Sequence, residues 1–144
     1  MKTIAIIPAR GGSKRLPGKN TKLLGEIPLL AHSILYAKQH NFIDAVYVST
    51  DDDVIKEIAL QYGAIVIDRP QALSGDLEPT VSALKHVLES IDEIIENVIL
   101  LQATNPLRPQ NLLQNAFAIF QEQQTNSLFT VSRSHHKLGK IINN

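Results

Sequence analysis

The 144-residue chain contains no cysteine, no tryptophan and a single methionine. Without cysteine it can form no disulfide bond, has no thiolate nucleophile and cannot build a cysteine-ligated zinc site. No apolar run approaches the roughly 20 residues that a membrane-spanning helix needs. Residues 1–3, Met-Lys-Thr, lead directly into an apolar run, so we expect no signal peptide and a cytoplasmic location.

Acidic residues are absent from the first 25 positions, which hold six Lys or Arg. The chain as a whole is neutral, with 14 Lys or Arg and 14 Asp or Glu. A neutral chain has no global positive field, so we expect neither nucleic acid nor a membrane as a partner. The content of 44% hydrophobic and 19% charged residues is that of a globular domain with one core.

The basic N-terminal segment is predicted to be a glycine-rich loop that follows a β-strand. Apolar residues 3–7 predict a short buried strand, and Gly11, Gly12 and Gly18 lie in the loop after it. Glycines let the chain turn tightly and bring backbone N–H groups close to an anion. Five cations on this loop would repel one another unless a negative group lies among them: Arg10, Lys14, Arg15, Lys19 and Lys22. We therefore predict a polyphosphate site, with a solvated basic loop as the alternative.

Two familiar phosphate-binding motifs do not fit this loop. A Walker A motif has four residues between its first glycine and Gly-Lys-Ser/Thr, but here five residues separate Gly12 from Gly18, and Asn20 follows Lys19. The dinucleotide motif G-x-G-x-x-G is absent because Gly11 and Gly12 are adjacent. The loop therefore represents a different kind of phosphate site.

The rest of the chain alternates predicted strands and helices. Further strands are expected at residues 45–49, 64–67, 97–102 and 127–132, and helices begin near Pro28, Thr50, Pro79 and Leu112. This alternation predicts an α/β three-layer sandwich with a mostly parallel sheet covered on both faces. Ligands of such sheets bind beyond the carboxyl ends of the strands. Polar clusters occur at those ends, in residues 10–20, 50–53, 69 and 102–108.

Three segments together resemble one enzyme family. Residues 7–20, I-P-A-R-G-G-S-K-R-L-P-G-K-N, are similar to the basic loop of the CMP-sialic acid synthetases (acylneuraminate cytidylyltransferases), which have the nucleotide-diphospho-sugar transferase type of fold. Residues 68–76 resemble the family's R-P-x-x-L-(S/A)-x-D loop, and residues 100–108 resemble its L-L-Q-P-T-S-P-L-R segment. The resemblance extends to about Lys140.

The resemblance implies transfer of CMP from CTP to an acidic nine-carbon sugar, with release of pyrophosphate, Mg²⁺ as cofactor and a homodimer in the complete protein. It assigns charge neutralisation in catalysis to Arg10, Lys14 and Lys19. The nucleotide-binding residues that it implies are Ala9, Arg10, Gly11, Gly12, Ser13, Lys14, Lys19, Asn20, Asp51, Arg69, Asp76, Thr80 and Ser82. The substrate-binding residues that it implies are Gln102, Thr104, Asn105 and Arg108.

Two departures from the family pattern concern the sugar. Ala103 replaces the usual proline, which is expected to loosen the turn, and Asn105 replaces the usual serine. N-acetylneuraminic, pseudaminic and legionaminic acids therefore remain open as substrates. A cytidylyltransferase for the eight-carbon sugar Kdo and a non-catalytic nucleotide-binding module are the alternatives.

Several of these residues also have structural interpretations. Thr50 or Asp51 could cap the helix that follows, and Arg69 could pair with Asp68. Thr80 and Ser82 could cap the helix after Pro79, where Val81, Leu84, Leu88 and Ile91 are expected to face the core.

We expect residues 1–134 to form the CTP-binding domain and residues 135–144 to begin a truncated sugar-side and dimerisation segment. The family's magnesium-binding aspartates would lie beyond Asn144, so the metal ligands are unknown. We expect these 144 residues alone to bind CTP weakly and turn over little.

Overall fold

The computed structural model describes residues 2–12 and 16–133. The chain divides into two units, residues 1–108 and 109–144, which are described separately. Among the described residues, no helix is long and apolar enough to cross a membrane.

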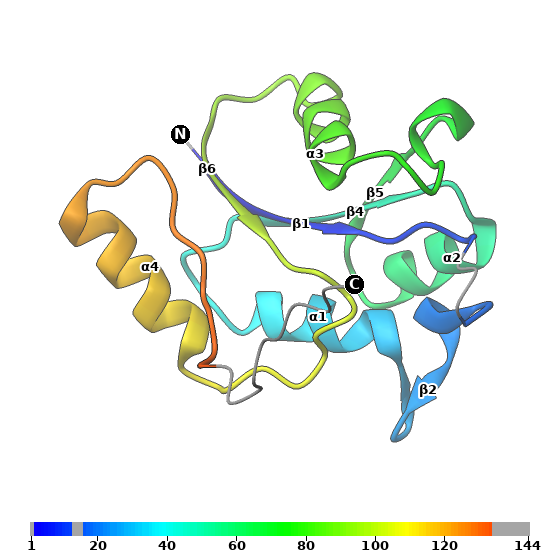
Figure 1. Ribbon diagram of the computed structural model, residues 1–144, viewed down its shortest axis with the longest axis horizontal. Coiled ribbons are helices and arrows are strands. Elements are labelled where there is room, and N and C mark those ends of the chain that lie inside the picture. Colours follow the sequence, from blue (N-terminus) through cyan, green and yellow to red (C-terminus); the bar gives the residue numbers. More distant parts are fainter. Residues whose placement is uncertain (1, 13–15, 134–144) are drawn as a thin grey trace, which may run out of the picture. The chain divides into compact units, whose positions relative to one another are not determined.

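The first unit is built on a four-stranded parallel sheet with the order β5-β4-β1-β6 (Figure 1). Its strands are β1 (Lys2–Pro8), β4 (Ala45–Thr50), β5 (Ile65–Asp68) and β6 (Ile95–Leu100). The register places Ile6 of β1 between Tyr47 of β4 and Leu100 of β6. The parallel sheet and these four strands confirm the prediction from the sequence.

Helices cover both faces of this sheet. Helices α1 (Leu29–Lys38) and α2 (Asp53–Gln61) lie on one face, and α3 (Thr80–Glu89) lies on the other (Figure 1). Residues 4–7 of the central strand are completely buried, because a strand covered on both faces can be apolar at every position. The unit therefore has the three layers that the sequence predicted.

The core on the α3 side differs from the sequence prediction. Val87 packs with Ile4, Ile6 and Tyr47, whereas Val81 and Leu88 are 51% and 37% exposed. The inward stripe contains Leu84 and Ile91, as predicted, together with Ala83 and Val87. The predicted residues Val81 and Leu88 lie roughly a quarter turn from the centre of that stripe, at its flanks.

A short antiparallel hairpin, which the sequence analysis did not predict, follows the basic loop. Strand β2 (Leu23–Leu24) pairs with β3 (Ile27–Pro28) across a two-residue loop. Gly25 occupies the first loop position with φ 68°, a conformation that glycine adopts without strain. Two 3₁₀ turns, η1 (Lys19–Thr21) and η2 (Gln71–Leu73), complete the unit.

The described part of the second unit contains one helix, α4 (Leu112–Gln123), which confirms the predicted helix. The strand predicted at residues 127–132 was wrong, since that segment has no regular secondary structure. Phe129 and Val131 are 83% and 81% exposed. Their apolar side chains thus gain little burial, and β-propensity alone does not hold a strand that lacks a packed face.

Candidate functional site

Polar side chains from three neighbouring strands meet at one edge of the sheet. Arg10 follows β1, Asp51 follows β4 and Arg69 follows β5. Because the strands are parallel and adjacent, their carboxyl ends lie side by side. This is the edge at which the sequence predicted a ligand.

The start of the basic loop is fixed to the end of β4. The Ala9 N–H donates to the carbonyl oxygen of Ser49 at 2.9 Å, and the Gly11 N–H donates to Asp51 Oδ1 at 3.0 Å. From the other side, Asn20 Nδ2 donates to the Arg10 carbonyl oxygen at 3.2 Å. The backbone at Arg10 and Gly11 is therefore held in place from both directions.

Gly11 approaches α2 too closely for any side chain. A Cβ atom at Gly11 would lie 2.5 Å from Asp52 Oδ2 and 2.8 Å from Asp52 Cβ. A Cβ atom at Gly12 would meet no atom within 4 Å. Of these two glycines, only Gly11 is required by the packing.

The Arg10 side chain forms an ion pair across the site. Arg10 Nη1 lies 2.7 Å from Asp76 Oδ1, and both side chains are about one third exposed. Asp76 belongs to the loop before α3, so the pair connects the loop after β1 to the loop before α3. A phosphate that took the place of the carboxylate would find a guanidinium with suitable geometry.

Arg69 is buried against the end of β4. Its Nε donates to Ser49 Oγ at 3.0 Å and its Nη2 donates to the Ser49 carbonyl oxygen at 2.6 Å. Burial lowers the pKa of Arg69, while the nearby Asp51 charge acts in the opposite direction and Arg10 adds to the lowering. The suggested pairing of Arg69 with Asp68 does not occur, since Asp68 binds Lys56.

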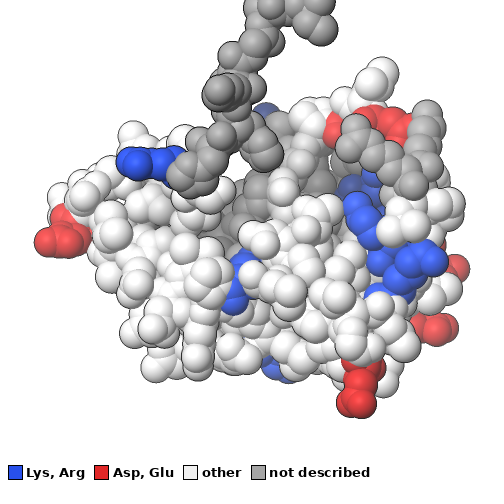
Figure 2. Space-filling view, turned by 60° about the horizontal axis from the view of Figure 1, so that its bottom comes forward, with Lys and Arg blue, Asp and Glu red and all other residues white. Residues whose placement is uncertain are grey.

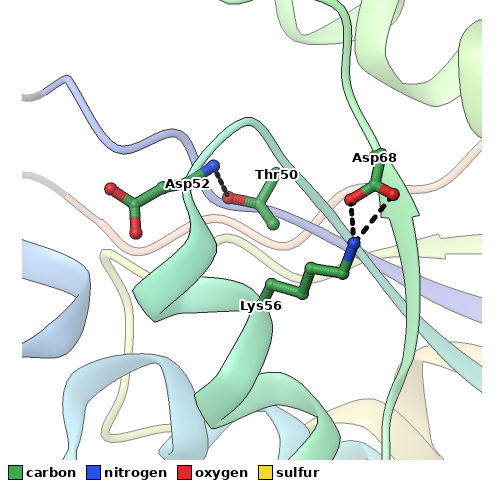
Figure 3. Close-up of polar contacts among 4 residues, drawn as sticks. All are labelled: Thr50, Asp52, Lys56 and Asp68. Carbon is green, nitrogen blue, oxygen red and sulfur yellow. Dashed lines mark hydrogen bonds and ion pairs between the residues drawn. The ribbon is translucent and has the colours of Figure 1, made fainter.

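Figure 3 shows how α2 is attached beside the site. Lys56 Nζ contacts both carboxylate oxygens of Asp68, at 2.7 and 2.9 Å. The Asp52 N–H donates to Thr50 Oγ1 at 3.2 Å (Figure 3). Asp52 Oδ1 also accepts the Ile55 N–H at 2.9 Å. Asp52 is therefore the N-cap of α2, so the expectation that Thr50 or Asp51 caps this helix was wrong. The Asp51 carboxylate binds the Gly11 N–H instead.

The polar segment after β6 forms a turn. The Leu101 N–H donates to the Ile6 carbonyl oxygen, and the Asn105 N–H donates to the Gln102 carbonyl oxygen at 3.1 Å. The side chains of Gln102, Thr104 and Asn105 are exposed, whereas Ala103 is buried. The turn thus presents to solvent three of the four residues that were predicted to contact the sugar.

Lys19 opens the 3₁₀ turn η1 and is partly buried. Gly18 precedes it in the left-handed conformation, with φ 63°. The predicted contacts at Ser13 and Lys14 lie outside the described residues. Lys and Arg side chains gather on one side of the face in Figure 2, the side on which Figure 1 places β2 and α2.

Thr80 and Ser82 lie in the first turn of α3, whose N-cap residue is Pro79. Pro79 makes no side-chain cap hydrogen bond. Asp76, a few residues before this helix, is connected to the basic loop through its ion pair with Arg10. The nucleotide contacts assigned to Thr80 and Ser82 stay predictions.

Magnesium has no preformed cluster of ligands in the part of the chain that the structure describes. No group of three or more His, Asp or Glu side chains in residues 2–12 and 16–133 could hold a metal ion. Three carboxylates at the sheet edge are each engaged elsewhere: Asp51 with Gly11, Asp52 with Ile55 and Asp76 with Arg10.

Sequence reasoning missed the residues that support the site. Ser49 accepts both hydrogen bonds of Arg69, and Ser33 accepts one from Arg108. Ser33 and Ser49 are completely buried. A small polar residue within an apolar strand or on the inward face of a helix is the signal that could have identified both.

Known proteins are similar to this chain both in fold and in sequence. A CMP:2-keto-3-deoxy-manno-octonic acid synthetase complexed with CTP superposes with a TM-score of 0.74 and 25% identity, covering 86% of this chain and 49% of that one. The fold is thus that of the nucleotide-diphospho-sugar transferases. The 4-diphosphocytidyl-2C-methyl-D-erythritol synthase, at 20% identity and a TM-score of 0.62, shares this fold.

A sequence model of the family described as cytidylyltransferase matches residues 4–143. The chain belongs to the cytidylyltransferase family. It is 41% identical to a CMP-N,N'-diacetyllegionaminic acid synthase of Legionella pneumophila over 83% of this chain and 53% of the relative. It is 38% identical to a pseudaminic acid cytidylyltransferase of Campylobacter jejuni, over 99% of this chain and 63% of the relative. The chain therefore spans about half to two thirds of the length of these two relatives.

Proposed function

We propose that this chain is the CTP-binding part of a cytidylyltransferase that transfers CMP to a nonulosonic acid, releasing pyrophosphate. The proposal rests on the loop at Arg10 and Gly11. Asp51 holds this loop through the Gly11 N–H, and the buried Arg69 lies nearby. This arrangement joins a phosphate-type loop to two guanidinium groups at the carboxyl edge of the sheet. It supports a site for a negatively charged nucleotide.

In the proposed reaction, the anomeric hydroxyl oxygen of the sugar attacks the α-phosphorus of CTP. A new P–O bond forms, the bond from the α-phosphorus to the bridging oxygen breaks, and pyrophosphate leaves with that oxygen. The sugar hydroxyl releases its proton to the surrounding water. Such a transfer depends on positioning and on neutralising the phosphate charge more than on covalent chemistry.

We assign that neutralisation to Arg10 and Lys19, together with Lys14. Arg10 would exchange its Asp76 partner for phosphate oxygens, which form charge-assisted hydrogen bonds with guanidinium. Arg69 already uses Nε and Nη2 on Ser49, so it would present its remaining donors from a fixed position. We assign the nucleotide's pyrimidine side to Arg69, Thr80 and Ser82.

The relatives favour a nine-carbon acidic sugar. Enzymes named for legionaminic, pseudaminic and acylneuraminic acids match at 41%, 38% and 39% identity. The G-G-S-K segment before R-L-P-G-K, which resembles the sialic acid synthetases, agrees with this assignment. A Kdo substrate is the second candidate, because a 3-deoxy-manno-octulosonate cytidylyltransferase of Hydrogenovibrio crunogenus matches at 34% over 96% of this chain.

Replacement of Lys19 tests the proposed loop function. We expect Lys19→Ala to weaken CTP binding at least about tenfold, because a charged contact of this kind contributes about 1.5–3 kcal/mol. Lys22→Ala is the matched control, since Lys22 is an exposed lysine just beyond the 3₁₀ turn, and its affinity should stay within about twofold. Calorimetric titration with CTP measures both. Equal effects of the two substitutions would mean that only the general charge of the loop matters.

A further inference from the structure

The turn after β6 lacks the proline that the resembled family has directly after the position of Gln102. Ala103 stands at that position, and one backbone hydrogen bond, from Asn105 to Gln102, closes the turn. Gln102 itself is exposed, so its side chain has no packing to restrain it. The rigidity of this turn needs another source.

Arg108 provides a connection from this turn to α1. Its Nη2 donates to the Gln102 carbonyl oxygen at 2.7 Å, and its Nη1 donates to Ser33 Oγ at 2.9 Å. Its guanidinium carbon lies 5.5 Å from the centroid of the Tyr36 ring, close enough for a cation–π contact. One planar group therefore binds the turn, a helix hydroxyl and an aromatic face.

The α1 side of this connection is rigid. Ser33 is completely buried and Tyr36 is 7% exposed, and both lie on the helix face that packs in the core. A guanidinium presents its donors in a fixed planar fork, so fixing one nitrogen on Ser33 restricts where the other can lie. The Gln102 carbonyl oxygen accepts hydrogen bonds from both Arg108 and the Asn105 N–H. It is therefore held by the link to α1 and by the turn itself.

We propose that Arg108 is a positioning residue for the sugar side of the site. It holds the Gln102–Asn105 turn against α1, and so fixes the direction of the Gln102 side chain at the carboxyl end of β6. Arg108 then acts through Gln102 and not by contact with the substrate. The functional half of this inference rests on the proposed function, because it concerns the sugar.

Amide hydrogen exchange tests the connection without any need for turnover. We expect Arg108→Met to raise the exchange rate of the Asn105 N–H, which closes the turn on the Gln102 carbonyl oxygen, at least about tenfold, as a loss of about 1.4 kcal/mol of local stability would. Arg108→Lys keeps the charge but can supply only one point contact, so its exchange should be intermediate. Arg133→Met, at an exposed arginine of the other unit, is the control and should leave this exchange rate unchanged. Unchanged exchange in both Arg108 variants would overturn the proposal.

Substitution of Ser33 separates positioning from direct contact. Ser33 is buried and cannot touch a substrate, yet Ser33→Ala removes one of the bonds of Arg108. With CTP and N-acetylneuraminic acid, we expect Arg108→Met to raise the KM for the sugar about tenfold. We expect Ser33→Ala to raise it about threefold, and the double variant to raise it by less than the product of the two single effects. The Kd for CTP should stay within about twofold in all three variants.

Two results distinguish the possible failures. A large effect of Arg108→Met with none from Ser33→Ala would show that Arg108 touches the sugar itself, which overturns the positioning role. A wild-type chain that fails to bind CTP would refute the proposed function, while the exchange measurement would still decide whether Arg108 holds the turn. If the wild-type chain binds CTP without measurable turnover, the exchange result alone confirms or overturns the proposal.

Discussion

At the scale of single residues, three consecutive positions at the end of β4 have three different tasks. Thr50 accepts the N–H of Asp52, Asp51 holds the Gly11 N–H, and Asp52 caps α2. Gly11 fits against Asp52 only because it has no side chain. The end of β4 therefore sets the shape of the basic loop that follows β1.

The first prediction concerns the two adjacent glycines of the loop. Gly11→Ala would push the loop away from Asp52, and crowding of this kind costs about 1–3 kcal/mol. We expect it to weaken CTP binding at least about fivefold. Gly12→Ala meets no atom within 4 Å and should bind CTP within about twofold of the unmodified chain. Calorimetry with both variants decides the matter, and equal losses would show that the loop's contact with Asp52 is not what shapes the site.

The second prediction concerns the Arg10–Asp76 ion pair. If the carboxylate occupies the position that a phosphate takes, Asp76→Asn should strengthen CTP binding by up to about fivefold, since a partly exposed pair is worth about 0–1 kcal/mol. Asp68→Asn is the matched control, because Asp68 pairs with Lys56 and not with Arg10. Weaker CTP binding by Asp76→Asn would instead make Asp76 a nucleotide contact, the role that the sequence suggested.

At the scale of elements, α2 is anchored at both ends beside the site. Asp52 caps its N-terminus, and Lys38 Nζ of α1 donates to the carbonyl oxygens of Tyr62 and Gly63 just beyond its C-terminus, at 3.2 and 3.5 Å. Lys56 adds a bond from the middle of the helix to Asp68 at the end of β5 (Figure 3). These contacts fix the helix whose first turn borders Gly11.

The third prediction tests the N-cap of α2. Asp52→Ala removes the acceptor of the Ile55 N–H and should lower the free energy of unfolding by about 1 kcal/mol. Asp52→Asn keeps an oxygen in the same place and should retain most of the stability. Urea denaturation of the two variants measures the difference. Equal stability of Asp52→Ala and the unmodified chain would contradict the assignment of Asp52 as the cap.

The elements themselves were largely predictable from the sequence, for a physical reason. Residues 4–7, 46–48 and 30–37 form apolar patterns of the right period, and burial follows directly from such patterns. The failures occurred where pattern and packing diverge. Val81 and Leu88 are apolar but lie at the flanks of α3, and residues 127–132 look like a strand but have no buried face.

At the scale of the whole molecule, the edge of the sheet was predictable but its internal contacts were not. Strand alternation places residues 10, 51, 69 and 102 at one edge regardless of side-chain detail. The detailed contacts depend on the exact positions of segments up to 75 residues apart in the sequence. They include the carboxylate that binds Gly11 and the atoms that Arg69 and Arg108 contact. Periodicity carries no information on such contacts, which is why the cap of α2 was assigned to Thr50 or Asp51 and not to Asp52.

We propose that the carboxyl edge of this sheet is a CTP site. Calorimetric titration of the chain with CTP, UTP, ATP and GTP under identical conditions tests it most directly. We predict that CTP binds at least about tenfold more tightly than ATP or GTP, because Arg69, Thr80 and Ser82 offer short hydrogen-bonding groups suited to a pyrimidine, and a difference of about 1.4 kcal/mol suffices. Equal affinity for CTP and ATP would show a general phosphate site and contradict the claim.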